Sequence, residues 1–443
     1  MKNFPTINWA IQITHDPTNL VLLPYNEYLK YADANPEDEE KLHDMKVVID
    51  EESLIKSFKY VAMDIDDDKC LYLLYKLRKA ILKIQEHNQL VIQSDLENEK
   101  DRIEELIRKV WEKRGIYPSL NKIINQFLEN EKLSINITKL LSKIADKKND
   151  LLKIFSEIIE GEVPVELSEY EDDLLDLTEK RLFKSNYKAL LKLSLFNLTQ
   201  NQIDRIIKNK KLLGEIEENP YALYEEYKTE EDDLDKPEIQ DEPIDVYKID
   251  VGIIPDKNYV NRHRKIQNLV EDSPERIRSV IINYLRVIGQ QGHCYDNTQN
   301  ILEEIRENPL IYKNDIKIDE EEIIHLSSDY KSHFIEKLDI ETTEEDTYYY
   351  LKKIRAAENQ VKETIVKLIK RPDIKAKKYD TEIHIRESLK ILNHIITDEK
   401  EKQVFKEERT RLYKNIFTKA LYLLTGKPGS GKTREIINVV KHL

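Results

Sequence analysis

The stretch Leu421-Tyr-Leu-Leu-Thr425, followed by Gly426-Lys-Pro-Gly-Ser-Gly-Lys-Thr433, decides how this sequence is interpreted. An apolar run leads into the pattern G-x-x-x-x-G-K-T, and residues 434–442 continue with apolar side chains at helical spacing. A strand, a glycine-rich loop and a helix in this order are typical of a phosphate-binding P-loop. We therefore predict a nucleotide site at the start of an α/β ATPase domain, of which residues 401–443 form the first part.

The residue types of the loop predict roles in binding ATP and Mg²⁺. Glycines leave room for successive backbone N–H groups to surround phosphate oxygens. Lys432 would contact the β- and γ-phosphates, and the Thr433 hydroxyl would ligate Mg²⁺, which makes these two the candidate catalytic residues. Only 9 glycines occur in 443 residues, so their concentration here argues against a chance match. The predicted ATP-binding residues are Gly426, Lys427, Pro428, Gly429, Ser430, Gly431, Lys432, Thr433 and Arg434.

A complete P-loop ATPase needs more than this loop. An acidic strand holds Mg²⁺ and positions water, and an arginine finger usually stabilises the transition state. Both are expected downstream of Thr433, where the sequence has ten further residues. We therefore expect the chain to be the N-terminal part of a larger ATPase and to be inactive in ATP hydrolysis by itself.

Composition limits the classes of function. The 85 acidic and 71 basic residues give a net charge of −14, which argues against binding nucleic acid through bulk charge but leaves room for a local basic face. The two cysteines, Cys70 and Cys294, are far apart, so no disulfide framework or zinc spacing is predicted. No run approaches the ~18 apolar residues of a membrane span. A cytoplasmic protein without a membrane partner is expected.

The N-terminal part divides into a β-rich and a helical region. Residues 1–70 contain short β-rich runs, and residues 71–180 show helical apolar stripes to which we assign core packing and no function. The cluster Asp64-Ile-Asp-Asp-Asp68 allows a metal site or a solvated acidic turn, and we favour the turn because no partner motif is present.

Residues 181–300 contain the features that suggest DNA binding. Two amphipathic stretches within residues 187–207 meet at Phe196-Asn-Leu-Thr199, which is the outline of a helix–hairpin–helix, although an ordinary helical hairpin fits equally well. In a helix–hairpin–helix, hairpin N–H groups and nearby Lys or Arg hold a phosphate without reading sequence. A basic cluster over residues 262–278 is either a phosphate-contacting or a solvated face, and the acidic stretch 224–243 is predicted to be an insertion. The candidate DNA contacts are Asn197, Thr199, Arg205, Lys208, Arg262, Arg264, Lys265, Arg276 and Arg278.

Four segments in this order resemble the N-terminal region of bacterial RecD-like superfamily 1 DNA helicases that carry an extended helix–hairpin–helix region. They are Glu218-Asn-Pro-Tyr221, Ser273-Pro-Glu-Arg-Ile-Arg278 leading to Gly292-His-Cys-Tyr295, Tyr350–Glu358 and Gly426–Thr433. The resemblance implies a RecA-like motor that couples ATP hydrolysis to 5′→3′ movement on DNA, with single-stranded or tailed duplex DNA as its partner. Pro243 and Asp245 replace glycines of the family's second hairpin, which implies that this hairpin is structural.

Together these features predict a mainly α fold. We expect a helical multi-domain array with a small β-rich or α/β part at residues 1–70, helices over 71–180, the DNA-binding array over 181–300, a helical connector over 301–400 and the incomplete RecA-like domain over 401–443. Two other functions stay open. One is a P-loop switch or defence ATPase that regulates a partner or nuclease, and the other is a non-enzymatic DNA-binding or scaffold module with a remnant P-loop.

Overall fold

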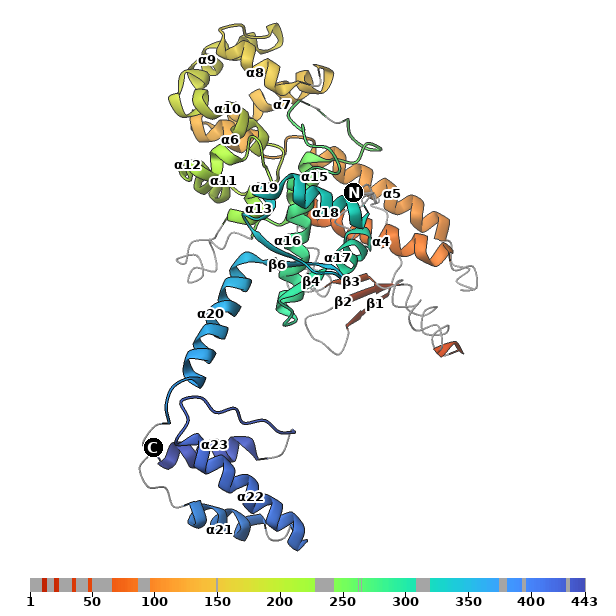
Figure 1. Ribbon diagram of the computed structural model, residues 1–443. Coiled ribbons are helices and arrows are strands. Elements are labelled where there is room, and N and C mark those ends of the chain that lie inside the picture. Colours follow the sequence, from red (N-terminus) through yellow and green to blue (C-terminus); the bar gives the residue numbers. More distant parts are fainter. Residues whose placement is uncertain are drawn as a thin grey trace. The chain divides into compact units, whose positions relative to one another are not determined.

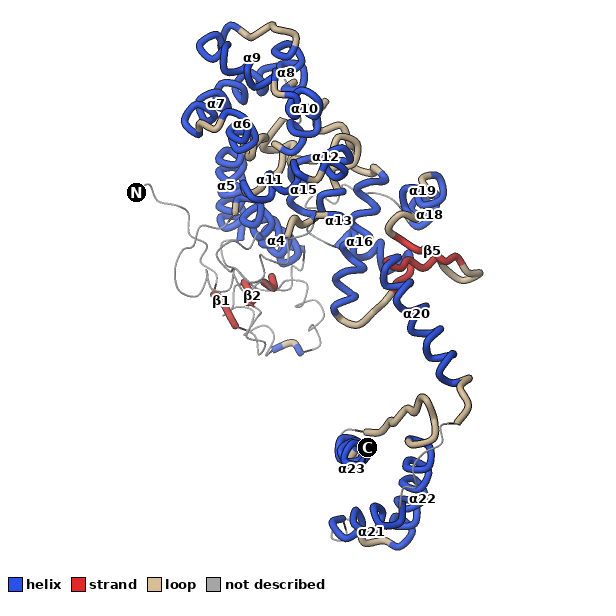
Figure 2. Tube along the Cα trace, turned by 90° about the vertical axis from the view of Figure 1, so that its left-hand side faces the viewer, coloured by secondary structure: helices blue, strands red, loops and turns tan. Residues whose placement is uncertain are grey.

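The computed structural model describes residues 10–13, 20–23, 34–36, 47–49, 66–86, 96–148, 150–227, 243–261, 263, 265–307, 319–373, 381–392, 396–427 and 431–442. The chain forms two compact units, Met1–Leu351 and Lys352–Leu443. Both are mainly helical, as predicted (Figures 1 and 2). Among the described helices, none is both long and apolar enough to span a bilayer.

The first unit carries two small antiparallel sheets. The strands β1 (Ala10–Ile13), β2 (Leu20–Leu23) and β3 (Val47–Ile49) pair in that order, on runs that the sequence marked as β-rich. The second sheet has the order β4-β6-β5, and its strands are β4 (Tyr295–Asn297), β5 (Leu338–Thr342) and β6 (Thr347–Leu351).

Helices make up most of the first unit. A first pair, α4 (Asp67–Glu86) and α5 (Leu96–Arg114), packs side by side. A longer array follows, in which short turns join amphipathic segments. It consists of α6 (Leu120–Leu128), α7 (Glu131–Lys148), α8 (Leu151–Ile159), the 3₁₀ helix η2 (Val165–Tyr170), α9 (Glu171–Glu179), α10 (Arg181–Leu193), α11 (Gln200–Lys208), α12 (Lys210–Glu215) and α13 (Ala222–Glu226).

The helix α15 (Val246–Ile253) lies where two hydrophobic cores meet. All eight of its residues are buried, and its two charged residues, Lys248 and Asp250, form ion pairs with Asp66 and Arg276. Ile249 belongs to the large core that runs from Ile116 to Ile266, whereas Tyr247 and Val251 complete a smaller core against α4 and α5. The large core crosses residue 180, where the sequence predicted a change of region.

A third core forms where α16 (Pro274–Gln290) and α17 (Thr298–Glu307) pack against the second sheet. The short helices α18 (Glu320–Asp329) and α19 (Lys331–Phe334) complete it. Pro274 occupies the first turn of α16, where a missing N–H leaves no helical hydrogen bond unmade, and Ser273 precedes it at the cap position without a side-chain cap bond.

The described residues of the second unit form four helices and a connecting segment. The helices are α20 (Lys352–Ile369), α21 (Thr381–Leu392), α22 (Glu399–Ile416) and α23 (Lys432–His442). The predicted strand at residues 421–425 is not a strand, which corrects that part of the expectation. Tyr422 and Leu424 pack on a core of α22 and α23, while Leu421 and Leu423 are 41% and 81% exposed. The segment is therefore covered on one side only.

Candidate functional site

The predicted P-loop lies between residue 425 and the start of α23. The helix begins at Lys432, directly after Gly431, whose φ of +83° is in the left-handed region that favours glycine. The Lys432 ammonium donates to the carbonyl oxygens of Gly426 at 2.6 Å and Lys427 at 2.9 Å. The side chain therefore folds back across the loop, beside the backbone that would surround a phosphate.

The orientation of α23 is set by a buried carboxylate in its first turn. Glu435 accepts a hydrogen bond from Arg409 Nε of α22 at 2.8 Å and another from the Tyr413 hydroxyl. Its own N–H donates to the Gly431 carbonyl oxygen at 3.1 Å. These contacts direct the Glu435 charge toward α22, so it does not face the loop. The partial positive charge of the helix N-terminus remains on the loop side, where it favours an anion.

The remaining ATP-binding candidates divide by exposure. Gly426, Lys427 and Thr433 are exposed, and Arg434 is half-buried. The other three candidates, Pro428, Gly429 and Ser430, lie outside the described residues. The described part of the loop is therefore open to solvent, as a site for a diffusing nucleotide must be.

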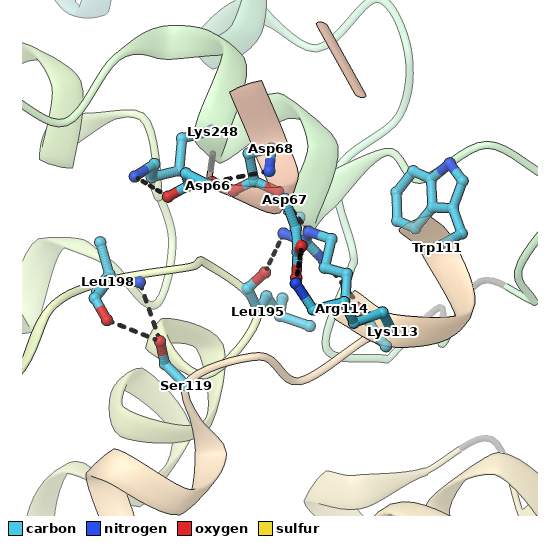
Figure 3. Close-up of polar contacts among 12 residues, drawn as sticks. Asp66, Asp67, Asp68, Trp111, Lys113, Arg114, Ser119, Leu195, Leu198 and Lys248 are labelled. Carbon is cyan, nitrogen blue, oxygen red and sulfur yellow. Dashed lines mark hydrogen bonds and ion pairs between the residues drawn. The ribbon is translucent and has the colours of Figure 1, made fainter. Parts of the chain in front are cut away.

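The predicted hairpin connects α10 to α11, and its turn lies where the sequence placed it. Thr199 caps α11 with a capping box, because its hydroxyl accepts from the Gln202 N–H at 3.1 Å while the Gln202 side chain accepts from the Thr199 N–H at 2.9 Å. The Leu198 N–H donates to Ser119 Oγ at 3.0 Å (Figure 3). Asn197 is half-buried. The amides of Leu198 and Thr199, which the prediction offered to a phosphate, thus already have acceptors within the chain.

Basic side chains from other helices cover the carbonyl side of this turn. Lys122 donates to the Leu198 carbonyl at 2.6 Å, and Arg114 donates to the Leu195 carbonyl at 3.0 Å. These bonds join the hairpin to the segment between α5 and α6. The hairpin is therefore a packing element of the large core.

The acidic cluster at residues 66–68 is a partly buried ionic contact, and the prediction of a solvated acidic turn was wrong (Figure 3). Asp68 and Arg114 form an ion pair in which both side chains are 1% exposed. Asp66 Oδ2 lies 3.2 Å from Lys248 Nζ of α15. Burial alone would raise the pKa of the Asp66 carboxyl, but Lys248 holds it below its usual value. The cluster ties α4 to α5 and α15.

The basic cluster predicted to face DNA is largely buried or paired. Arg276 forms two hydrogen bonds with the carboxylate of Asp250, at 2.6 and 2.8 Å, and is 1% exposed. Arg278 pairs with Glu225, and both side chains are 1% exposed. Neither guanidinium can reach a phosphate in this fold, so these two assignments are corrected.

The other DNA-binding candidates are distributed unevenly. Lys265 pairs with Asp150, whose carboxylate also caps α8. Arg205 is half-buried and Lys208 exposed on α11. Arg262 and Arg264 lie outside the described residues. The candidates that the structure describes are thus not brought together into one basic surface.

A basic run that the sequence reasoning missed lies on α20. Residues 352–371 contain seven basic and two acidic residues, in a chain with a net charge of −14. No residue of α20 is buried. A count of charge in a sliding window would have found this segment, because the signal is local.

Comparison of the chain with models of known protein families, with curated proteins and with solved structures found no match in any of the three.

Proposed function

We propose that the chain is the N-terminal part of a RecD-like superfamily 1 DNA helicase, which binds Mg²⁺-ATP at residues 426–434. The observation that carries the proposal is Lys432 at the first position of α23, with its ammonium against the carbonyls of Gly426 and Lys427. When a nucleotide binds, the Lys432 ammonium would exchange these two carbonyl partners for β- and γ-phosphate oxygens. Phosphate oxygens are stronger hydrogen-bond partners for an ammonium group because they are charged. Thr433 would supply the hydroxyl that ligates Mg²⁺.

The segment before the loop supports a RecA-like domain around this site. Leu421 and Leu423 are exposed on the side that faces away from α22 and α23, and Tyr422 and Leu424 on the other side are packed. This alternation suits a strand of a sheet covered on both faces. In the proposal, neighbouring parallel strands pair with this segment, and helices on the other face of the sheet cover the two leucines. One of these strands carries the acidic residue that completes the Mg²⁺ site.

Nucleotide binding by the chain tests the ATP site. The fluorescence of an N-methylanthraniloyl derivative of ATP, titrated with the protein in Mg²⁺, should show saturable binding. Lys432→Ala should weaken it by at least about tenfold, because a charge-assisted contact of about 1.5–3 kcal/mol is lost. Lys406→Ala removes an exposed lysine of α22 outside the loop and should leave the affinity unchanged. Equal affinities for the Lys432→Ala variant and the parent would refute the site.

The helicase part of the proposal requires DNA binding. Tailed duplex and single-stranded DNA should associate with the chain at low salt, with an affinity that falls as salt rises because counterions are released. Absence of any salt-dependent association would contradict a DNA-directed motor, whatever the result for ATP.

A further inference from the structure

The helix α20 and the two residues after it form an exposed basic segment. Between Lys352 and Arg371 the net charge is +5, which leaves −19 for the remainder of a chain whose total is −14. Six of its seven basic residues are exposed, and Arg355 is half-buried. A polyanion would therefore be repelled by most of the chain and attracted to this segment.

The basic residues surround the helix on every side except one. At about 100° per residue, Ile354, Val361, Ile365 and Leu368 form a single apolar stripe. Lys353 and Lys367 flank this stripe on one side, and Lys362 flanks it on the other. The basic surface therefore extends along the whole helix. Eighteen residues span about 27 Å, or about eight nucleotide steps at 3.4 Å per strand.

We propose that α20 binds the phosphate backbone of single-stranded DNA, without reading its sequence. This inference rests on the proposed function for the identity of the polyanion. Charge complementarity carries it, together with the burial of Arg276 and Arg278, which removes these two arginines from the predicted DNA contacts. A lipid surface is the less suitable polyanion, because α20 has no Trp, Phe or Tyr to enter the membrane interface.

The experiment uses the full chain and a fluorescein-labelled oligothymidine of about ten nucleotides, whose anisotropy is followed against salt. The test variant is K352Q/K353Q/K362Q/K367Q, in which Gln preserves helix propensity. The control, K132Q/K139Q/K143Q/K147Q, removes the same charge from exposed lysines of α7. Both helices have 18 residues. Circular dichroism of each variant establishes that the helical content is unchanged.

The α20 variant should lower the slope of log K against log[salt] by about 3, since each lost contact with a single strand contributes about 0.7. The α7 variant should retain the slope and the affinity of the parent. Equal losses in both variants would show an effect of bulk charge, and an unchanged slope in the α20 variant would exclude the helix. Either result overturns the proposal.

Two further arms separate this inference from its alternatives. Sedimentation with vesicles of phosphatidylcholine and phosphatidylserine tests the lipid surface. Loss of vesicle binding in the α20 variant with unchanged DNA binding would overturn the proposal in favour of lipid. The K432A variant should keep its DNA affinity. If the chain does not bind ATP but binds DNA through α20, the proposed ATP site is refuted and the inference about α20 stands. If the chain binds ATP but its DNA binding does not depend on α20, only the inference about α20 is refuted.

Discussion

The buried contact between Arg276 and Asp250 is predicted to be a structural determinant of the first unit. The Asp250 carboxylate accepts two hydrogen bonds from Arg276, at 2.6 and 2.8 Å, and a third from the Tyr221 hydroxyl at 2.7 Å. Arg276 is 1% and Asp250 4% exposed. Replacement of Arg276 by Met keeps much of the side-chain volume but leaves the carboxylate buried without its counter-ion. Such a loss costs about 3–5 kcal/mol.

Urea unfolding, followed by far-UV circular dichroism, measures this cost. Arg108→Met is the matched control because this arginine is 57% exposed on α5, and its effect should stay within about 0.5 kcal/mol. The double variant R276M/D250L should recover part of the loss, since no unpaired charge remains. A cost below about 1 kcal/mol for Arg276→Met would refute the buried ion pair. Weaker DNA binding at unchanged stability would restore Arg276 as a DNA contact.

Three further predictions concern packing, pH and the P-loop helix. A Cβ on Gly252 would lie 2.7 Å from the Leu195 carbonyl oxygen, so Gly252→Ala should lower the free energy of unfolding by about 1–3 kcal/mol. A Cβ on Gly214 would have no neighbouring atom within 4 Å. Gly214→Ala should therefore raise the free energy of unfolding by about 0.5–1 kcal/mol in the same urea titration. Burial and the Arg278 guanidinium hold the pKa of His333 at about 4, below its unfolded value of 6.5. The unfolded chain therefore binds the extra proton first, and stability should fall by about 1–2 kcal/mol as pH decreases from 6.5 to 4. The variant His333→Gln should reduce this dependence, and identical pH profiles of thermal unfolding would disprove it. Glu435→Ala should weaken nucleotide binding although it changes no residue of the loop, because α23 loses its hydrogen bonds to α22. An unchanged nucleotide affinity would show that other contacts orient α23.

Local signals were enough to predict the mainly helical fold and the position of the hairpin turn. Thr199 and Gln202 are three residues apart, so the capping box that ends the turn depends only on neighbouring residues. The fate of Asp68 could not be predicted in this way, because its partner Arg114 lies 46 residues further along the chain. Lys248 is 182 residues from Asp66. An acidic run looks solvated in sequence until folding brings distant cations to it.

The P-loop region shows the same division between local and distant causes. The helix after Gly431 needs only its own sequence and a packing face, and it forms as predicted. A strand needs a paired neighbour for its backbone hydrogen bonds, and residues 421–425 have none among the described residues. The apolar alternation of Leu421 to Leu424 therefore indicates how the segment would pair, whereas pairing itself depends on other strands.

The segments that resemble RecD-like helicases contribute differently to fold and to DNA binding. Tyr221 of the Glu-Asn-Pro-Tyr segment and Arg276 of the Pro-Glu-Arg-Ile-Arg segment meet at Asp250, where all three are buried. Their side chains thus connect the two segments through one shared carboxylate. They cannot also contact a phosphate. The proposed DNA binding would then depend on exposed charge outside these segments, as we propose for α20.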